Sequence, residues 1–138
     1  RMLFNPEESI DFNGHTGPFI QYTYARIRSL MRKAKEPQLT ETNDVFSLLL
    51  NEKEKELIKA IHRFPKILSD AAESYSPAIV ANYVYELAKQ YNQFYHELPV
   101  LKEEDKQLAA FRLELSETTS KLIKKSMGLL GIEVPERM

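Results

Sequence analysis

The stretch GHTGPFIQYTYARIRSLMRKAK, residues 14–35, carries the pattern of an amphipathic helix. Pro18 suits the first turn of a helix, and Pro37 disfavours helical backbone at the residue before it, so we predict a helix between about Gly17 and Lys35. At about 100° per residue, one side of this helix is apolar and is predicted to pack in the core. That side consists of Ile20, Tyr24, Ile27, Met31 and Ala34.

A second side of the same helix combines aromatic rings with positive charge. Arg28 and Arg32 extend its charge, and no acidic residue occurs between His15 and Lys35, although the whole chain has a formal net charge of -1. One interpretation is a solvated basic face. The other is a nucleic-acid surface, because Arg and Lys neutralise phosphates and rings stack on unpaired bases. This second side, predicted to face outward, consists of Phe19, Tyr22, Arg26, Ser29 and Lys33.

The remainder of the 138-residue chain is also patterned for helices. Asn51 and Glu54 have the spacing of a capping box, Pro65 interrupts or restarts the helix that follows, and Ser76-Pro77 begins another. The long helix from Pro77 ends at Pro99, and a last helix from about Glu104 ends at Gly131. Strand signals are weak, so we predict an all-α bundle of about five helices in a single domain.

Composition excludes several classes of function. The chain has no cysteine, which excludes disulfides, cysteine-based zinc sites and thiol nucleophiles, and fits a reducing compartment. It has no apolar run of about 18 residues, so we expect no membrane span. The three histidines are far apart in sequence, and no phosphate-binding loop or nucleophile motif occurs. We therefore expect neither catalytic residues nor a metal site.

Three segments carry a resemblance to a known family. These are GPFIQYTYARIRSLMRKA at 17–34, YVYELAKQYNQFYHELPV at 83–100 and LLGIEVPERM at 129–138. In this order and spacing they resemble the C-terminal anticodon-binding domain of arginyl-tRNA synthetases, the DALR domain. The resemblance covers nearly all of the chain.

The resemblance implies that the parent protein is a class I synthetase, an arginine–tRNA ligase that joins arginine to its tRNA using ATP with magnesium. Its catalytic domain lies upstream, and the HIGH-type signature of that domain does not occur here. We therefore expect residues 1–138 to form one anticodon-binding domain, with 1–14 a remnant of the connection to the catalytic domain. The expected partners are arginine tRNA and that upstream domain. We further expect a cytoplasmic monomer that holds no cofactor of its own.

The resemblance also implies the residues of the anticodon site. An aromatic residue, a Tyr and an Arg on the first helix, a later Tyr and the last Met correspond to Phe19, Tyr22, Arg26, Tyr95 and Met138. The family usually has Tyr at the first position, so Phe19 keeps the ring and loses a hydroxyl. The middle anticodon cytosine is the implied determinant. On charge alone, the candidates for phosphate contacts are Arg28, Arg32 and Lys33.

Two alternatives remain at this point. A free-standing helical module could use the same aromatic and basic helix face for a protein partner. A different class I synthetase, such as a cysteinyl one, could carry a related domain, although the PERM ending at 135–138 favours the arginyl enzymes.

Overall fold

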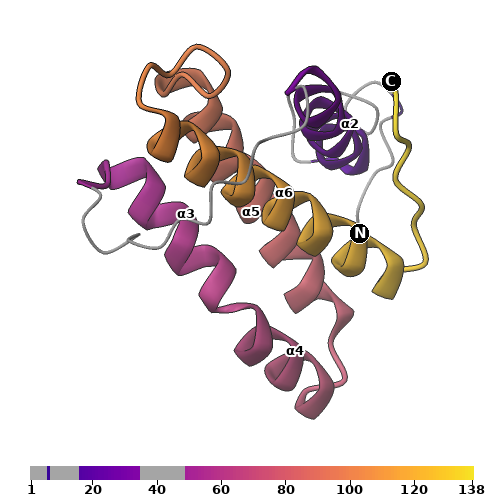
Figure 1. Ribbon diagram of the computed structural model, residues 1–138. Coiled ribbons are helices and arrows are strands. Elements are labelled where there is room, and N and C mark those ends of the chain that lie inside the picture. The colour runs from indigo at the N-terminus through magenta and orange to yellow at the C-terminus, as the bar shows by residue number, and fades with distance from the viewer. Residues whose placement is uncertain (1–5, 7–15, 35–48) are drawn as a thin grey trace.

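The computed structural model describes Pro6, residues 16–34 and residues 49–138, and within these ranges it contains helices and no strand. This confirms the predicted all-α fold (Figure 1). The expected remnant at 1–14 lies outside the described residues, apart from Pro6. The helices are α2 (Gly17–Lys33), α3 (Glu52–His62), α4 (Phe64–Glu73), α5 (Pro77–Glu97) and α6 (Lys106–Leu129).

Helix α5 is the centre of the bundle, since it packs against each of the other helices given above. Its buried side includes Leu87, Tyr91 and Phe94, which are at most 1% exposed. The hydroxyl of Tyr91 is tolerated there because it donates to Ser116 Oγ on α6 at 3.2 Å. Burial raises the pKa of Tyr91, so the phenol stays neutral in the core.

The helix boundaries follow from the capping and proline signals of the sequence. Asn51 and Glu54 form the predicted capping box at the start of α3. Ser76 stands at the N-cap of α5 without a side-chain capping bond, and Pro77 opens that helix. Helix α6 begins at Lys106, slightly later than the predicted Glu104. The reason is Asp105, whose carboxylate accepts hydrogen bonds from the first free backbone N–H groups of the helix.

Helix α2 lies across α5 and α6 (Figure 1). Its predicted core side is confirmed for Ile20, Tyr24 and Ile27, which are buried, and Leu30 is buried with them. Met31 is only half-buried. The helix ends at Lys33 with Ala34 as its C-cap, so it is slightly shorter than predicted.

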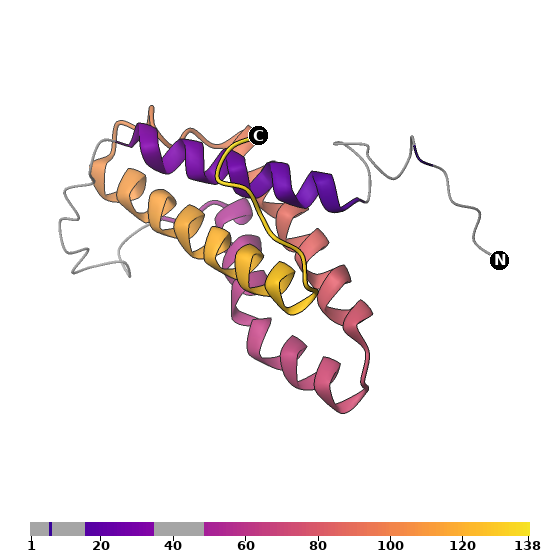
Figure 2. The same ribbon diagram turned by 90° about the vertical axis from the view of Figure 1, so that its right-hand side faces the viewer.

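The chain reverses direction after α6 at Gly131, as its glycine predicted. Gly131 has φ +74, and the N–H of Ile132 donates to Met127 O at 2.9 Å while Gly131 N–H donates to Gly128 O at 3.0 Å. These two bonds form a Schellman motif. Residues 132–138, here called the tail, then run back beside α2 (Figure 2).

Candidate nucleic-acid interface

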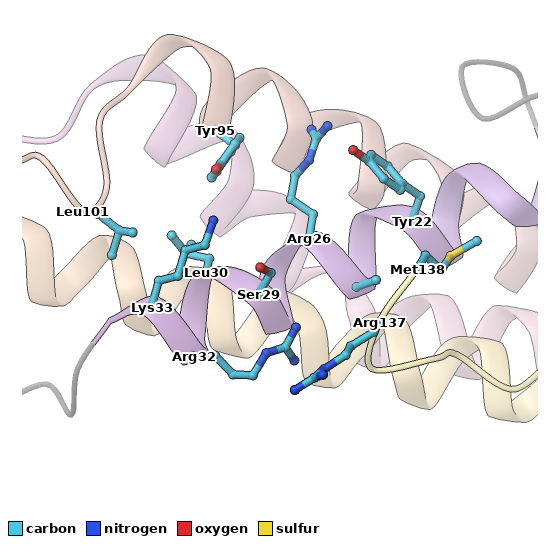
Figure 3. A pocket seen from close by; sticks show the side chains of 11 residues that line it. Tyr22, Arg26, Ser29, Leu30, Arg32, Lys33, Tyr95, Leu101, Arg137 and Met138 are labelled. Carbon is cyan, nitrogen blue, oxygen red and sulfur yellow. The ribbon is translucent and has the colours of Figure 1, made fainter.

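A hollow of about 480 Å³ opens where α2, the end of α5 and the tail meet. Figure 3 shows its lining side chains, which come from segments far apart in the sequence. The lining residues are Tyr22, Ala25, Arg26, Ser29, Leu30, Arg32, Lys33, Tyr95, Leu101, Arg137 and Met138.

Arg26 lies between two tyrosine rings on the wall of this hollow (Figure 3). Its guanidinium carbon is 4.9 Å from the centre of the Tyr22 ring and 5.4 Å from the centre of the Tyr95 ring. Both distances are within the range of a cation–π interaction. The three side chains therefore form one preorganised unit built from α2 and α5.

A hydrogen-bonded asparagine fixes the orientation of Arg26. Arg26 Nη1 donates to Asn92 Oδ1 at 2.5 Å, and Asn92 Nδ2 in turn donates to Thr23 Oγ1 at 2.8 Å and to Ala88 O at 2.9 Å. Because a guanidinium has five N–H donors, the bond to Asn92 leaves donors for a ligand. Asn92 lies nearly one helical turn before Tyr95, so α5 supplies both contacts to Arg26 from one face.

The two rings of the unit present surface to solvent. Tyr22 is 39% exposed and Tyr95 is 36% exposed, while the Tyr95 ring stacks on the buried Tyr91 with centroids 6.1 Å apart. A ring that is partly exposed offers apolar surface to a planar group. Nucleic-acid bases are such groups.

The charged side chains that line the hollow are all positive. Arg26, Arg32, Lys33 and Arg137 line it, and the described lining residues include no Asp or Glu. Such a surface attracts anions, and phosphate groups fit it together with the exposed rings.

The structure brings together four of the five residues that the family resemblance indicated. Tyr22, Arg26, Tyr95 and Met138 all line the hollow. Phe19 does not: its ring is half-buried, with its centre 5.5 Å from the Tyr85 ring. We predicted that Phe19 faces outward, but it flanks the core side of α2, where α5 covers it.

The three predicted phosphate contacts are divided between two surfaces. Arg32 and Lys33 are exposed and line the hollow. Arg28 lies outside it and pairs with the tail, where its Nε donates to Glu136 Oε2 at 2.8 Å. The hydrogen bond to Glu136 raises the pKa of Arg28.

Sequence reasoning missed Asn92, Leu101 and Arg137 at this site. Arg137 could have been found, because it adjoins Met138 in the closing motif. Asn92 and Leu101 carry no local signal of a site, since the packing of α5 against α2 places Asn92 and the connection after α5 places Leu101. Among the described residues, no group of three or more His, Asp or Glu side chains is placed to hold a metal ion.

The bundle and its ring-lined, basic hollow define an all-α domain with a surface that fits a nucleic acid. The sequence model of the family described as "DALR anticodon binding domain" matches residues 20–138, and the chain belongs to this family. Arginine–tRNA ligases from Porphyromonas gingivalis and Parabacteroides distasonis are each 55% identical to it over 138 residues. In both alignments 99% of this chain is matched, and it spans 23% of the length of these curated relatives.

Solved structures agree with this assignment. The arginyl-tRNA synthetase of Thermus thermophilus superposes with a TM-score of 0.84 at 31% identity, and that of Plasmodium falciparum with 0.82 at 27%. Each match covers 98% of this chain and 23% of the synthetase. No helix of the described residues is both long and apolar enough to span a membrane.

Proposed function

We propose that this chain is the anticodon-binding part of an arginine–tRNA ligase, and that its hollow holds bases of the anticodon loop of arginine tRNA. The observation that carries the proposal is the Tyr22–Arg26–Tyr95 unit, with its two part-exposed rings and its fixed guanidinium. Loop bases are unstacked and can be read along their edges while their faces lie on aromatic rings.

The residues divide into two roles in this proposal. Tyr22 and Tyr95 stack on bases, and Arg26 donates to a base edge or a phosphate. Arg32, Lys33 and Arg137 neutralise phosphates at the rim of the hollow. Met138 adds an apolar contact from the tail. Phe19 supports α2 through Tyr85 and has no contact with RNA in this proposal, although the family resemblance indicated one.

The complete enzyme joins arginine to its tRNA with ATP and magnesium, and this chemistry belongs to the catalytic domain rather than to this chain. We infer that this domain binds the anticodon end of the tRNA, while the catalytic domain binds the acceptor end. The tRNA and the enzyme meet in the cytoplasm, and one anticodon loop occupies one hollow in a monomer.

The test is the binding of the 138-residue chain to a labelled anticodon stem-loop of arginine tRNA, followed by fluorescence anisotropy. We expect tighter binding than to the same stem-loop with the middle anticodon base changed. Affinity is also expected to fall as salt rises. Equal affinity for the two stem-loops would overturn the proposal, and binding insensitive to salt would contradict the phosphate contacts at the rim.

Tyr22→Ala is the matched variant, since it removes one exposed ring of the unit. A lost base stack weakens binding by about 1–3 kcal/mol. Tyr75→Ala is its control, because Tyr75 is 94% exposed and does not line the hollow. Equal loss in the two variants would show that the Tyr22 ring has no specific role.

A further inference from the structure

One stripe of α2 holds the tail through hydrogen bonds. Gln21 Nε2 donates to the backbone oxygen of Glu133 at 2.8 Å, and the next donors along the helix, Tyr24, Arg28 and Arg32, all reach Glu136. These four donors are spaced by three, four and four residues, so they lie along one side of the helix. This side adjoins the one that faces the hollow.

Glu136 accepts three of these four hydrogen bonds. Its Oε1 accepts from the Tyr24 hydroxyl and its Oε2 from Arg28 Nε, each at 2.8 Å, while its backbone oxygen accepts from Arg32 Nη1 at 3.1 Å. We call this arrangement of Tyr24, Arg28, Arg32 and Glu136 the clasp. Tyr24 is 3% exposed, so its hydroxyl is fixed by a buried ring.

The clasp immediately precedes the two tail residues of the hollow. Arg137 and Met138 follow Glu136 directly and line the hollow with Tyr22 and Arg26 (Figure 3). Both are themselves exposed, and Met138 is 57% exposed, so burial does little to hold them in place. Their position depends on the anchor one residue before them.

We propose that Glu136 is a positioning residue of the RNA site, whose carboxylate clasps the tail to α2 so that Arg137 and Met138 form one wall of the hollow. This rests on the proposed anticodon function. Glu136 itself does not line the hollow and acts through its two neighbours.

The clasp uses both oxygens of the Glu136 carboxylate. Both partners of the carboxylate are donors, and a carboxylate accepts at either oxygen. The hydrogen bond from Arg28, followed by that from Tyr24, lowers the pKa of Glu136 and keeps it ionised. A glutamine at 136 carries no charge and loses the ion pair with Arg28, and it keeps a bond to Tyr24 only if its N–H₂ donates and the Tyr24 hydroxyl turns to accept.

The consequence for binding follows from the population of the ordered tail. If the tail occupies its place only a tenth of the time, the apparent affinity of a ligand that needs it falls about tenfold. We therefore expect Glu136→Gln to weaken binding of the arginine anticodon stem-loop about tenfold. Glu133→Gln is the control: it makes the same chemical change in the same tail, where only the backbone oxygen of Glu133 is bonded to α2.

A spectroscopic readout in the free protein tests the clasp independently of RNA. The chain has four methionines, and their methyl groups can be labelled with carbon-13 for NMR. Met138 reports the tail, whereas Met127, which is 1% exposed, reports the core. Glu136→Gln and Tyr24→Phe should each move the Met138 signal toward that of a disordered methionine and leave the Met127 signal unchanged. Glu133→Gln should move neither.

The outcomes separate the two proposals. An unchanged Met138 signal in Glu136→Gln, or an equal loss of affinity in Glu133→Gln, would overturn the clasp. A native chain that does not prefer the arginine anticodon would overturn the proposed function, while the methionine signals would still decide whether Glu136 orders the tail.

Discussion

Arg112 and Glu54 form an ion pair in the interior of the bundle. Arg112 Nε donates to Glu54 Oε1 at 2.6 Å, and the two side chains are 5% and 0% exposed. Other groups of the pair are also bonded: Arg112 Nη1 donates to Pro99 O and to Glu103 Oε2, and Glu54 Oε2 accepts from Asn51 N–H. This network joins α3, α6 and the connection that follows α5.

Removing one member of this pair should be costly. Arg112→Met leaves the Glu54 carboxylate buried without its partner, and such changes cost about 3–5 kcal/mol of unfolding free energy. Urea denaturation followed by circular dichroism measures the loss. Glu103→Gln is the milder comparison, because Glu103 is 18% exposed and its replacement leaves the Arg112–Glu54 bond in place. An Arg112→Met chain as stable as the native one would contradict this account.

Truncation of Phe19 should mainly lower the stability of the fold, and truncation of Tyr22 should mainly lower RNA affinity, although the two residues are less than one helical turn apart. Phe19→Ala removes a half-buried ring packed on Tyr85, and we expect a loss of about 2 kcal/mol in unfolding free energy. The affinity of the folded protein for the anticodon stem-loop should change little. Tyr22→Ala should lose affinity and keep most of its stability. Lost RNA affinity at native stability in Phe19→Ala would instead place that ring in the site.

Much of the fold could be predicted because its signals are local. A capping box, the prolines at helix starts and a glycine with positive φ each act within a few residues of their own position. The burial of Glu54 could not be predicted in this way. Its partner, Arg112, is 58 residues away, and only the packing of α3 against α6 brings the two together.

The site was predictable in part for the same reason. Helical periodicity found Tyr22, Arg26 and Lys33, since residues spaced by three and four share a face. Periodicity also placed Phe19 on this face. It could not show that α5 covers Phe19, because the pattern of one helix does not reveal how far a neighbouring helix extends over it. Tyr95 and Met138 were indicated as site residues only by the family resemblance, since they lie on segments remote in sequence from α2. Tyr24 was predicted to be in the core, but its ring also carries the hydroxyl that holds Glu136.

Gly131 should resist replacement, whereas the nearby Gly128 should not. Gly131 has φ +74, so an alanine there should lower the free energy of unfolding by about 1–2 kcal/mol. Nothing lies within 4 Å of the added Cβ, so this loss comes from backbone conformation rather than from a steric clash. Gly128 lies in the last turn of α6 with open space around it, and alanine there should gain about 0.5–1 kcal/mol. Thermal unfolding of the two variants should therefore shift in opposite directions.

Acid should open the clasp before it unfolds the bundle. The pKa of Glu136 is held below its usual 4.5 by Arg28 and Tyr24 on α2, with a smaller effect of Lys124 on α6. A carboxylate with a lowered pKa stabilises the folded form above its unfolded pKa, and this stabilisation is lost as pH falls through the folded value. The methyl signal of Met138 should be constant from neutral pH down to about 4.5 and change below it. Glu136→Gln should keep only the smaller change caused by the Met138 terminal carboxylate, which titrates in the same range; an equal change in the two proteins would assign the step to that carboxylate.

The salt dependence of RNA binding should identify which cations touch phosphate. Lys33 is exposed at the rim of the hollow and should neutralise one phosphate, so Lys33→Ala is expected to lower the slope of log affinity against log salt by about 0.7. Lys59→Ala on α3 removes the same charge from an exposed position outside the hollow and should leave the slope unchanged. Both slopes come from anisotropy titrations at several salt concentrations. An equal fall in the two variants would mean that RNA responds to the overall charge of the protein rather than to the hollow.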